Sequence, residues 1–117
     1  MAIQIRQQGK RVILDLSGDM KFARRKEFPQ AIADGLALKP QWLLCDLRNV
    51  ISLDSSGLAM LIVASEQCKS TSTQLGLICT EGKIKELLRM AHLHNSVRFF
   101  ASEKETDTLP AVDPTSP

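Results

Sequence analysis

Three features of the sequence predict one α/β domain built on a small mixed, mostly parallel β-sheet. Segments with strand character alternate with segments of helical periodicity in the order β-β-α-β-α-β-α-β, and about four helices are expected to cover the sheet. Helices that join successive strands imply right-handed crossovers and parallel pairing. The length of 117 residues and the hydrophobic content of 44% are those of a single folded domain.

The chain begins with a predicted β-hairpin. Ile3 and Ile5 start an alternating strand, and Gly9 provides the turn. The second strand, residues 12–16, is expected to stop at the polar residues 17–19. This hairpin adds an antiparallel edge to the sheet.

The first helix is predicted from apolar residues at four-residue spacing. Phe28, Ile32 and Leu36 would form one buried stripe. Pro29 is tolerated only in a first turn, so the regular helix is expected to begin near Phe28. The basic residues 24–26 then lie in the connection before the helix.

The middle of the chain contains the most informative segment. Residues 42–47 form a short apolar run that predicts a strand buried on both faces, and residues 48–53 are expected to form a turn. Asp54, Ser55, Ser56 and Gly57 then precede a helix over residues 58–68, whose apolar first half is expected to be buried.

The last third of the chain predicts a strand, a helix and a final strand. Residues 74–79 are the next strand, and four apolar residues at positions 84, 87, 88 and 91 mark an amphipathic helix. Residues 97–100 are the last strand. We therefore expect one domain over residues 1–102, followed at residues 103–117 by a short terminal helix or a flexible tail.

Composition excludes several classes of function. A net charge of +2 and an aromatic content of 4% argue against a nucleic-acid partner. The longest apolar run, residues 58–64, is far too short for membrane insertion, and the first residues lack a signal arrangement, so a cytoplasmic protein is expected. Cys45, Cys68 and Cys79 have wide, irregular spacing, which predicts buried, reduced thiols.

No motif in the chain indicates an enzyme. The Gly-x-Ser-x-Gly motif and the phosphate-binding glycine loops are missing. The histidines, His92 and His94, lie two residues apart at a helix end and do not share a helix face, which argues against metal ligation. We therefore expect no catalytic residues, no cofactor and no metal.

The serines that follow Asp54 lie where a helix is predicted to start. Ser55 and Ser56 would sit at the positive end of that helix, next to free backbone amides. A serine or Asp54 can cap such a helix, which is worth about 1 kcal/mol. Alternatively, a kinase can phosphorylate the exposed serine and add a charge of about −1.5 to −2. The residues alone leave both interpretations open.

The span from Ile3 to Phe100 resembles a STAS domain, the fold of bacterial anti-sigma factor antagonists. Residues 44–47 followed by residues 53–58 resemble the strand and phosphorylation loop of that family. Two further segments resemble this family: residues 17–19 at the predicted end of the second strand, and residues 84–100, which resemble its third helix and final strand.

The resemblance implies a phosphorylation-regulated, partner-switching protein of signal transduction and transcription regulation. Ser55 would be phosphorylated by a serine-kinase-type anti-sigma factor or related regulator, and a PP2C-type phosphatase would reverse the modification. The unmodified form would bind the kinase and the phosphorylated form would release it. By the same match, Asp54 would shape the loop, Ser56 would be a neighbour at the helix start, and Gly57 would let a partner's backbone approach closely.

The resemblance also suggests a docking surface around the phosphorylation loop. Leu58 would join it at the helix start, and possible contacts from residues 20–26 are Met20, Lys21, Arg24 and Arg25. Together with residues 48–53, this surface could supply the ~800 Å² per partner that is usual for an interface. The basic residues 24–26 are either a contact for an acidic partner or a solvated charge cluster.

Two alternatives to the switch stay open. In the first, the domain is a constitutive scaffold subunit of a membrane transport or signalling complex with no phosphoswitch, and Ser55 only caps the helix. In the second, the chain is an unrelated enzyme with a substrate pocket.

Overall fold

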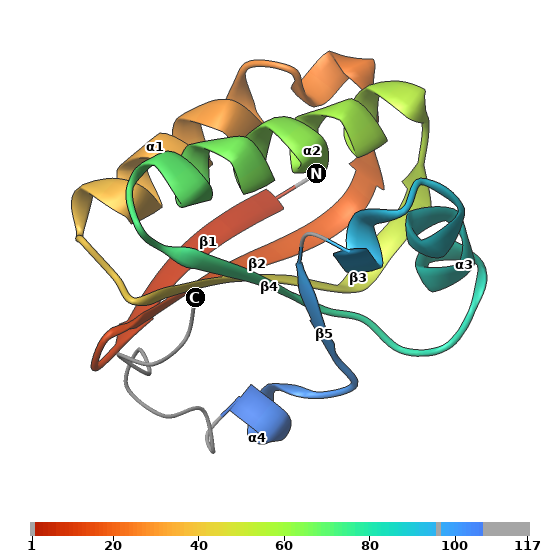
Figure 1. The fold of residues 1–117 in the computed structure, drawn as a ribbon. Coiled ribbons are helices and arrows are strands. Elements are labelled where there is room, and N and C mark those ends of the chain that lie inside the picture. Colours follow the sequence, from red (N-terminus) through yellow and green to blue (C-terminus); the bar gives the residue numbers. More distant parts are fainter. Residues whose placement is uncertain (1, 96, 107–117) are drawn as a thin grey trace.

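A five-stranded sheet in the order β1-β2-β3-β4-β5 is the framework of the protein (Figure 1). The computed structural model describes residues 2–95 and 97–106. Strand β1 (Ala2–Gln8) pairs antiparallel with β2 (Arg11–Met20). Strands β3 (Trp42–Leu53), β4 (Gln74–Ile78) and β5 (Arg98–Phe100) then follow in parallel. The predicted fold class and element order are confirmed.

The two longest helices described lie side by side on one face of the sheet (Figure 1). They are α1 (Glu27–Ala37) and α2 (Ser55–Ser70). Helix α3 (Lys83–Met90) connects β4 to β5, while the short α4 (Glu103–Thr106) lies on the opposite side of the sheet. Two 3-10 helices, η1 (Phe22–Arg24) and η2 (Leu93–Asn95), complete the described elements. In the described part of the chain, no helix has the length and apolar character needed to cross a membrane.

The alternation of side chains along the strands creates two buried clusters. Val12, Leu14 and Leu16 point toward α1 and α2 and belong to the larger cluster. The opposite face carries a smaller cluster, made of Ile13, Trp42, Leu44, Ile78 and Phe100. Strands β2 and β3 are therefore apolar on both faces, as the sequence predicts for residues 42–47 of β3.

Strands β2 and β3 are both longer than their sequences predict. Strand β2 does not stop at residues 17–19, and residues 48–53 are not a turn, because Gly18, Asp19 and Met20 pair with Val50, Ser52 and Leu53. Two register shifts interrupt this pairing, and Gly18 has a φ of +88° next to one of them. Bulges of this kind let a strand bend and continue through residues that read as a turn.

Helix α1 follows its predicted pattern. Phe28, Ala31 and Ile32 are buried, and Leu36 packs against the same core. Pro29 is the third helical residue, in the first turn, where its missing N–H costs nothing. This part of the prediction is confirmed.

Helix α2 differs from the prediction in how it is buried. Its buried residues form one stripe along the whole helix: Gly57, Leu61, Ala64, Ser65 and Cys68. Ile62 and Val63 are instead 43% and 52% exposed, so the expected burial of the first half is wrong. The reason is that α2 lies on the surface of the sheet and turns its other side to solvent.

The three cysteines are buried and free, as predicted. Burial raises the pKa of Cys45 and brings that of Cys68 to about 11. The tail predicted beyond Pro110 lies outside the described residues.

Candidate functional site

Asp54 joins β3 to α2 and connects both to η1. Its backbone is extended, with a φ of −102°, and its Oδ1 accepts a hydrogen bond from the Gly57 backbone N–H at 2.8 Å. Its Oδ2 accepts from the backbone N–H of Phe22 at 3.4 Å. Asp54 is therefore the residue that caps α2, and neither serine has that role.

Ser55 is the first residue of α2, and its side chain is exposed to solvent. Among the described residues, its hydroxyl makes no hydrogen bond. The hydroxyl lies at the end of the helix where the free backbone amides leave partial positive charge. Ser56, the next residue, is half-buried, so Ser55 is the more accessible of the two serines.

Gly57 lets α2 start in direct contact with the end of β2. A Cβ at this position would lie 2.3 Å from the carbonyl oxygen of Met20 and 2.5 Å from Leu53 Cδ1. The same carbonyl accepts a hydrogen bond from the Asp54 backbone N–H at 3.4 Å. The close approach that this glycine permits is therefore to the chain itself.

Two of the predicted partner contacts are wrong as a result. Gly57 is buried, and the Met20 side chain is 0% exposed, so neither residue is accessible to a partner. Leu58 is half-buried and packs against the main core. These residues support the segment of Asp54 and Ser55 from inside the fold.

The connection between β2 and α1 presents an aromatic ring next to Asp54. Phe22, in η1, is 58% exposed. The Arg25 guanidinium lies 4.3 Å from the centre of this ring, and its Nη1 donates to the Phe22 carbonyl at 3.3 Å. Lys21 and Arg25 are exposed, while Arg24 is half-buried and forms an ion pair with Glu27 at 3.2 Å. The sequence indicated these cations as possible partner contacts but gave no signal that singled out Phe22.

A row of small and apolar side chains continues from Ser55 along α2. Ala59, Ile62 and Val63 follow Ser55 by four, seven and eight residues, which places them on the same side of the helix. We call these three residues the outer stripe. All of them are exposed, and so is Ile51 near the end of β3, at 78%. Sequence reasoning missed this stripe because it assigned the apolar run to the core.

Three carboxylates on the other side of the sheet come within 4.8 Å of one another: those of Asp15, Asp46 and Glu103. Arg6 binds Asp15 at 2.5 and 3.0 Å and Glu103 at 2.5 and 3.3 Å, while Arg48 binds Asp46 at 2.6 and 3.0 Å. The two guanidinium groups occupy oxygens that a cation would need. The cluster thus serves to tie α4 to the sheet.

These ion pairs shift the pKa values of Asp46 and Arg6. Burial alone would raise the pKa of Asp46, but the side-chain and backbone hydrogen bonds from Arg48 outweigh it and lower that pKa. The hydrogen bonds to Asp15 and then to Glu103 raise the pKa of Arg6. The charged forms of Asp46 and Arg6 are therefore favoured.

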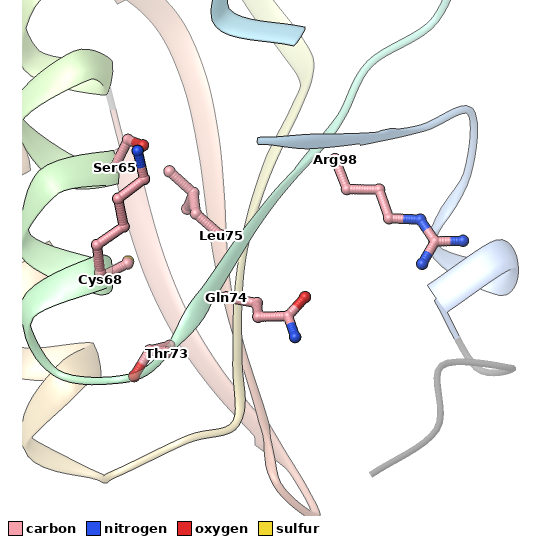
Figure 2. Close-up of a pocket in the computed structure, with 7 residues that line it drawn as sticks. Ser65, Cys68, Thr73, Gln74, Leu75 and Arg98 are labelled. Carbon is pink, nitrogen blue, oxygen red and sulfur yellow. The ribbon is translucent and has the colours of Figure 1, made fainter. Parts of the chain in front are cut away.

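A pocket of about 250 Å³ lies beside the second half of α2 (Figure 2). In Figure 2, Ser65, Cys68 and Leu75 lie on one side of β4, whereas Gln74 and Arg98 point away on the other side. The polar groups do not converge on one point, and the Thr73 hydroxyl already donates to the Pro40 carbonyl at 3.2 Å. This pocket offers no arrangement for a substrate.

A mixed five-stranded sheet with two helices on one face, and an exposed serine at the start of the second of them, define a small α/β domain of the STAS type. The family model of the STAS domain matches residues 2–106, and the chain belongs to this family.

Solved structures of several STAS-like proteins share the fold. The protein is similar to an anti-sigma factor antagonist from Mycobacterium paratuberculosis, with 19% identity, a TM-score of 0.82 and coverage of 92% of this chain and 91% of the other. It is similar to the phosphorylated form of the Bacillus cell fate determinant SpoIIAA, with 13% identity and a TM-score of 0.70. This match covers 91% of this chain and 97% of the other. It is also similar to a sulfate transporter family protein from Wolinella succinogenes, with 18% identity and a TM-score of 0.74. This match covers 84% of this chain and 82% of the other.

Proposed function

We propose that this protein is a phosphorylation-regulated anti-sigma factor antagonist. In its unmodified form it binds a serine-kinase-type anti-sigma factor or a related kinase regulator, and phosphorylation of Ser55 releases that partner. The observation that carries the proposal is the exposed hydroxyl of Ser55, which makes no hydrogen bond among the described residues and lies beside an exposed apolar surface. The likeness of the fold to a phosphorylated Bacillus determinant supports it.

The modification transfers the γ-phosphoryl group of ATP to Ser55 Oγ. The O–P bond forms as ADP leaves, and the hydroxyl proton passes to a base of the kinase. The product carries a charge of about −1.5 to −2, which the amides at the start of α2 tolerate. Hydrolysis by a PP2C-type phosphatase returns the hydroxyl and inorganic phosphate.

Release follows from the position of that charge. Phe22, whose backbone is bound to Asp54, and the outer stripe, which follows Ser55 along α2, offer exposed apolar contact area. A partner bound there would either bury the phosphate of Ser55 away from water or hold its own apolar surface against that charge. Both arrangements are unfavourable, because a buried charge without a partner loses its hydration. The protein itself then acts as a binding module, and the kinase and phosphatase supply the chemistry.

The phosphorylation site is tested with the purified serine kinases of the anti-sigma type from the source genome. Each is incubated with the protein and Mg²⁺–ATP, and intact mass and peptide mapping locate the phosphate. We expect a single phosphate that is lost in Ser55→Ala and retained in the matched control Ser56→Ala. A phosphate on Ser56, or no phosphorylation with any kinase of the panel, would contradict the proposal.

The release step is tested with a charge mimic. Ser55→Asp should weaken binding of that kinase by about 1–3 kcal/mol, or roughly 5- to 150-fold, in calorimetric titrations. Ser70→Asp places the same charge at the opposite end of α2 and should bind like the wild type. Equal affinity of the Ser55→Asp variant and the wild type would show that a charge at Ser55 does not control binding of the kinase.

A constitutive scaffold role is the second candidate, because the fold also matches a sulfate transporter family protein. In that case Ser55 would be an ordinary surface residue. The two functions differ in one measurement: a scaffold keeps its partner regardless of phosphate, while the proposed switch loses it.

A further inference from the structure

We infer that the partner of this protein presents an apolar socket rimmed by carboxylates, and that Phe22 enters this socket as the anchor of the interface. The inference rests on the proposed function and specifies the chemistry of its partner. The surface in question is the segment from Lys21 to Lys26, which we call the basic segment.

Phe22 has the properties of an interface anchor. It is a large aromatic side chain that no other element covers, and η1 contains no buried residue. Its backbone is held by Asp54, and its ring is held by Arg25 at 4.3 Å. Because the ring is already ordered, burying it in a partner costs little conformational entropy.

The charges around Phe22 determine what kind of surface fits. Lys21, Arg25 and Lys26 are exposed and form no ion pair within the described residues. Of the nearby acids, Glu27 forms an ion pair with Arg24, while Asp19 and Asp54 accept hydrogen bonds from the Ser52 hydroxyl and the Gly57 amide and keep their charge. The Ser52 hydrogen bond, and to a smaller extent the charge of Lys21, lower the pKa of Asp19, but neither acid forms an ion pair with the three exposed cations within the described residues. Three exposed cations therefore lie in the basic segment without an ion-pair partner among the described residues, and Arg25 contacts the ring itself.

An acidic protein surface complements this arrangement better than other occupants. Two copies of the chain would bring like charges together at this face. A nucleic acid would need a broad basic surface, whereas the net charge of the whole chain is +2 and the cations beside Phe22 are confined to one segment.

The inference also explains why phosphorylation would release the partner. Asp54 connects the basic segment to the start of α2, so a phosphate on Ser55 would be added beside it. The carboxylates of the partner would then meet a charge of their own sign. Like charges placed across an interface oppose binding.

The experiment uses the kinase that phosphorylates the wild-type protein, loaded with Mg²⁺–ADP so that no transfer takes place. Binding is measured by calorimetry at 50 and 300 mM salt for Phe22→Ser, for Arg25→Glu and for the control Lys104→Glu, which changes an exposed lysine of α4 on the opposite side of the sheet. Thermal unfolding of each variant verifies that it folds.

We expect Phe22→Ser to weaken binding at least about tenfold at both salt concentrations. Arg25→Glu should weaken it by a similar factor at low salt and much less at high salt, because salt screens exposed charges. The control should bind within about twofold of the wild type.

Three results would overturn the inference. If both variants bind like the wild type, the docking surface lies elsewhere, although the proposed function stands. If a 20-base-pair DNA duplex binds as tightly as the kinase and is lost in Arg25→Glu, the segment recognises phosphates. If no kinase phosphorylates the wild type, both proposals fall together.

Discussion

Replacing Gly57 with alanine is expected to destabilise the start of α2, where the helix meets β2. The added Cβ would lie 2.3 Å from the carbonyl oxygen of Met20, whereas 3.4 Å is an ordinary contact. A backbone oxygen cannot rotate away as a side chain can. The helix and the strand must therefore separate by about 1 Å, which loosens their packing and strains the hydrogen bond from Gly57 to Asp54.

The size of the effect follows from two opposing contributions. Overpacking a core costs about 1–3 kcal/mol, and a clash with backbone belongs at the upper end. Alanine gains up to about 1 kcal/mol over glycine within a helix. The net loss is about 2 kcal/mol, which is roughly a 30-fold change in the unfolding equilibrium and a fall in Tm of about 10 °C.

Urea unfolding followed by circular dichroism measures this loss, and Gly35→Ala is the matched control. Gly35 also faces the core from a helix, but its added Cβ would meet the methyl groups of Leu43 and Val12 at 3.0 and 3.3 Å. Methyl groups can yield by a few tenths of an ångström, so this variant should stay within about 1 kcal/mol of the wild type. Equal stability of the two variants would refute the argument that the start of α2 packs directly against the backbone of Met20.

Four further results are expected. Asp54→Ala should lose about 1–2 kcal/mol in urea unfolding, because it removes the cap of α2 and the bond to the Phe22 N–H; wild-type stability would contradict the capping role. The lowered pKa of Asp46 means that its ion pair stabilises the fold above the ordinary value of 3.8 and that this contribution disappears as the pH falls below it; the loss of stability between pH 7 and pH 3 should therefore be smaller in Asp46→Asn. Cys68, with a pKa of about 11, should react slowly with a thiol reagent at pH 7.5 until urea unfolds the protein, and fast labelling of the native state would contradict its burial. Glu103→Gln should accelerate hydrogen exchange in α4 but not in α1 or α2, and unchanged exchange in α4 would show that Arg6 does not hold it.

The sequence predicts the fold where the apolar pattern is simple. The spacing of Phe28 and Ile32 indicates the buried face of α1, and the uniform apolar run after Trp42 indicates a central strand. The prediction fails where pairing between strands outweighs local composition. Residues 48–53 read as a turn because they are polar in part, yet their backbone groups pair with β2 through two bulges that no local pattern reveals.

In the candidate site, too, features that depend on neighbouring residues can be predicted, whereas features that depend on tertiary contacts cannot. Asp54 and Ser55 can be recognised at a helix start, because capping and exposure depend on neighbours in the chain. The roles of Met20 and Gly57 depend on a contact between residues 37 positions apart, and that contact buries both. Similarly, the exposure of Ile62 follows from how α2 lies on the sheet. Such tertiary placement has no signature in a single sequence.

Asp54 links the two parts of the site, because its carboxylate accepts hydrogen bonds from both α2 and η1. It fixes the first turn of α2, which presents the Ser55 hydroxyl, and it anchors the backbone of Phe22, which presents the ring. The proposed phosphorylation site and the proposed anchor are thus held together through Asp54. A charge added to Ser55 then needs no conformational change to reach the partner, since it acts directly on whatever is bound beside Phe22. Control of this kind requires only that the hydroxyl and the ring stay together, which makes Asp54 as important to the switch as the serine itself.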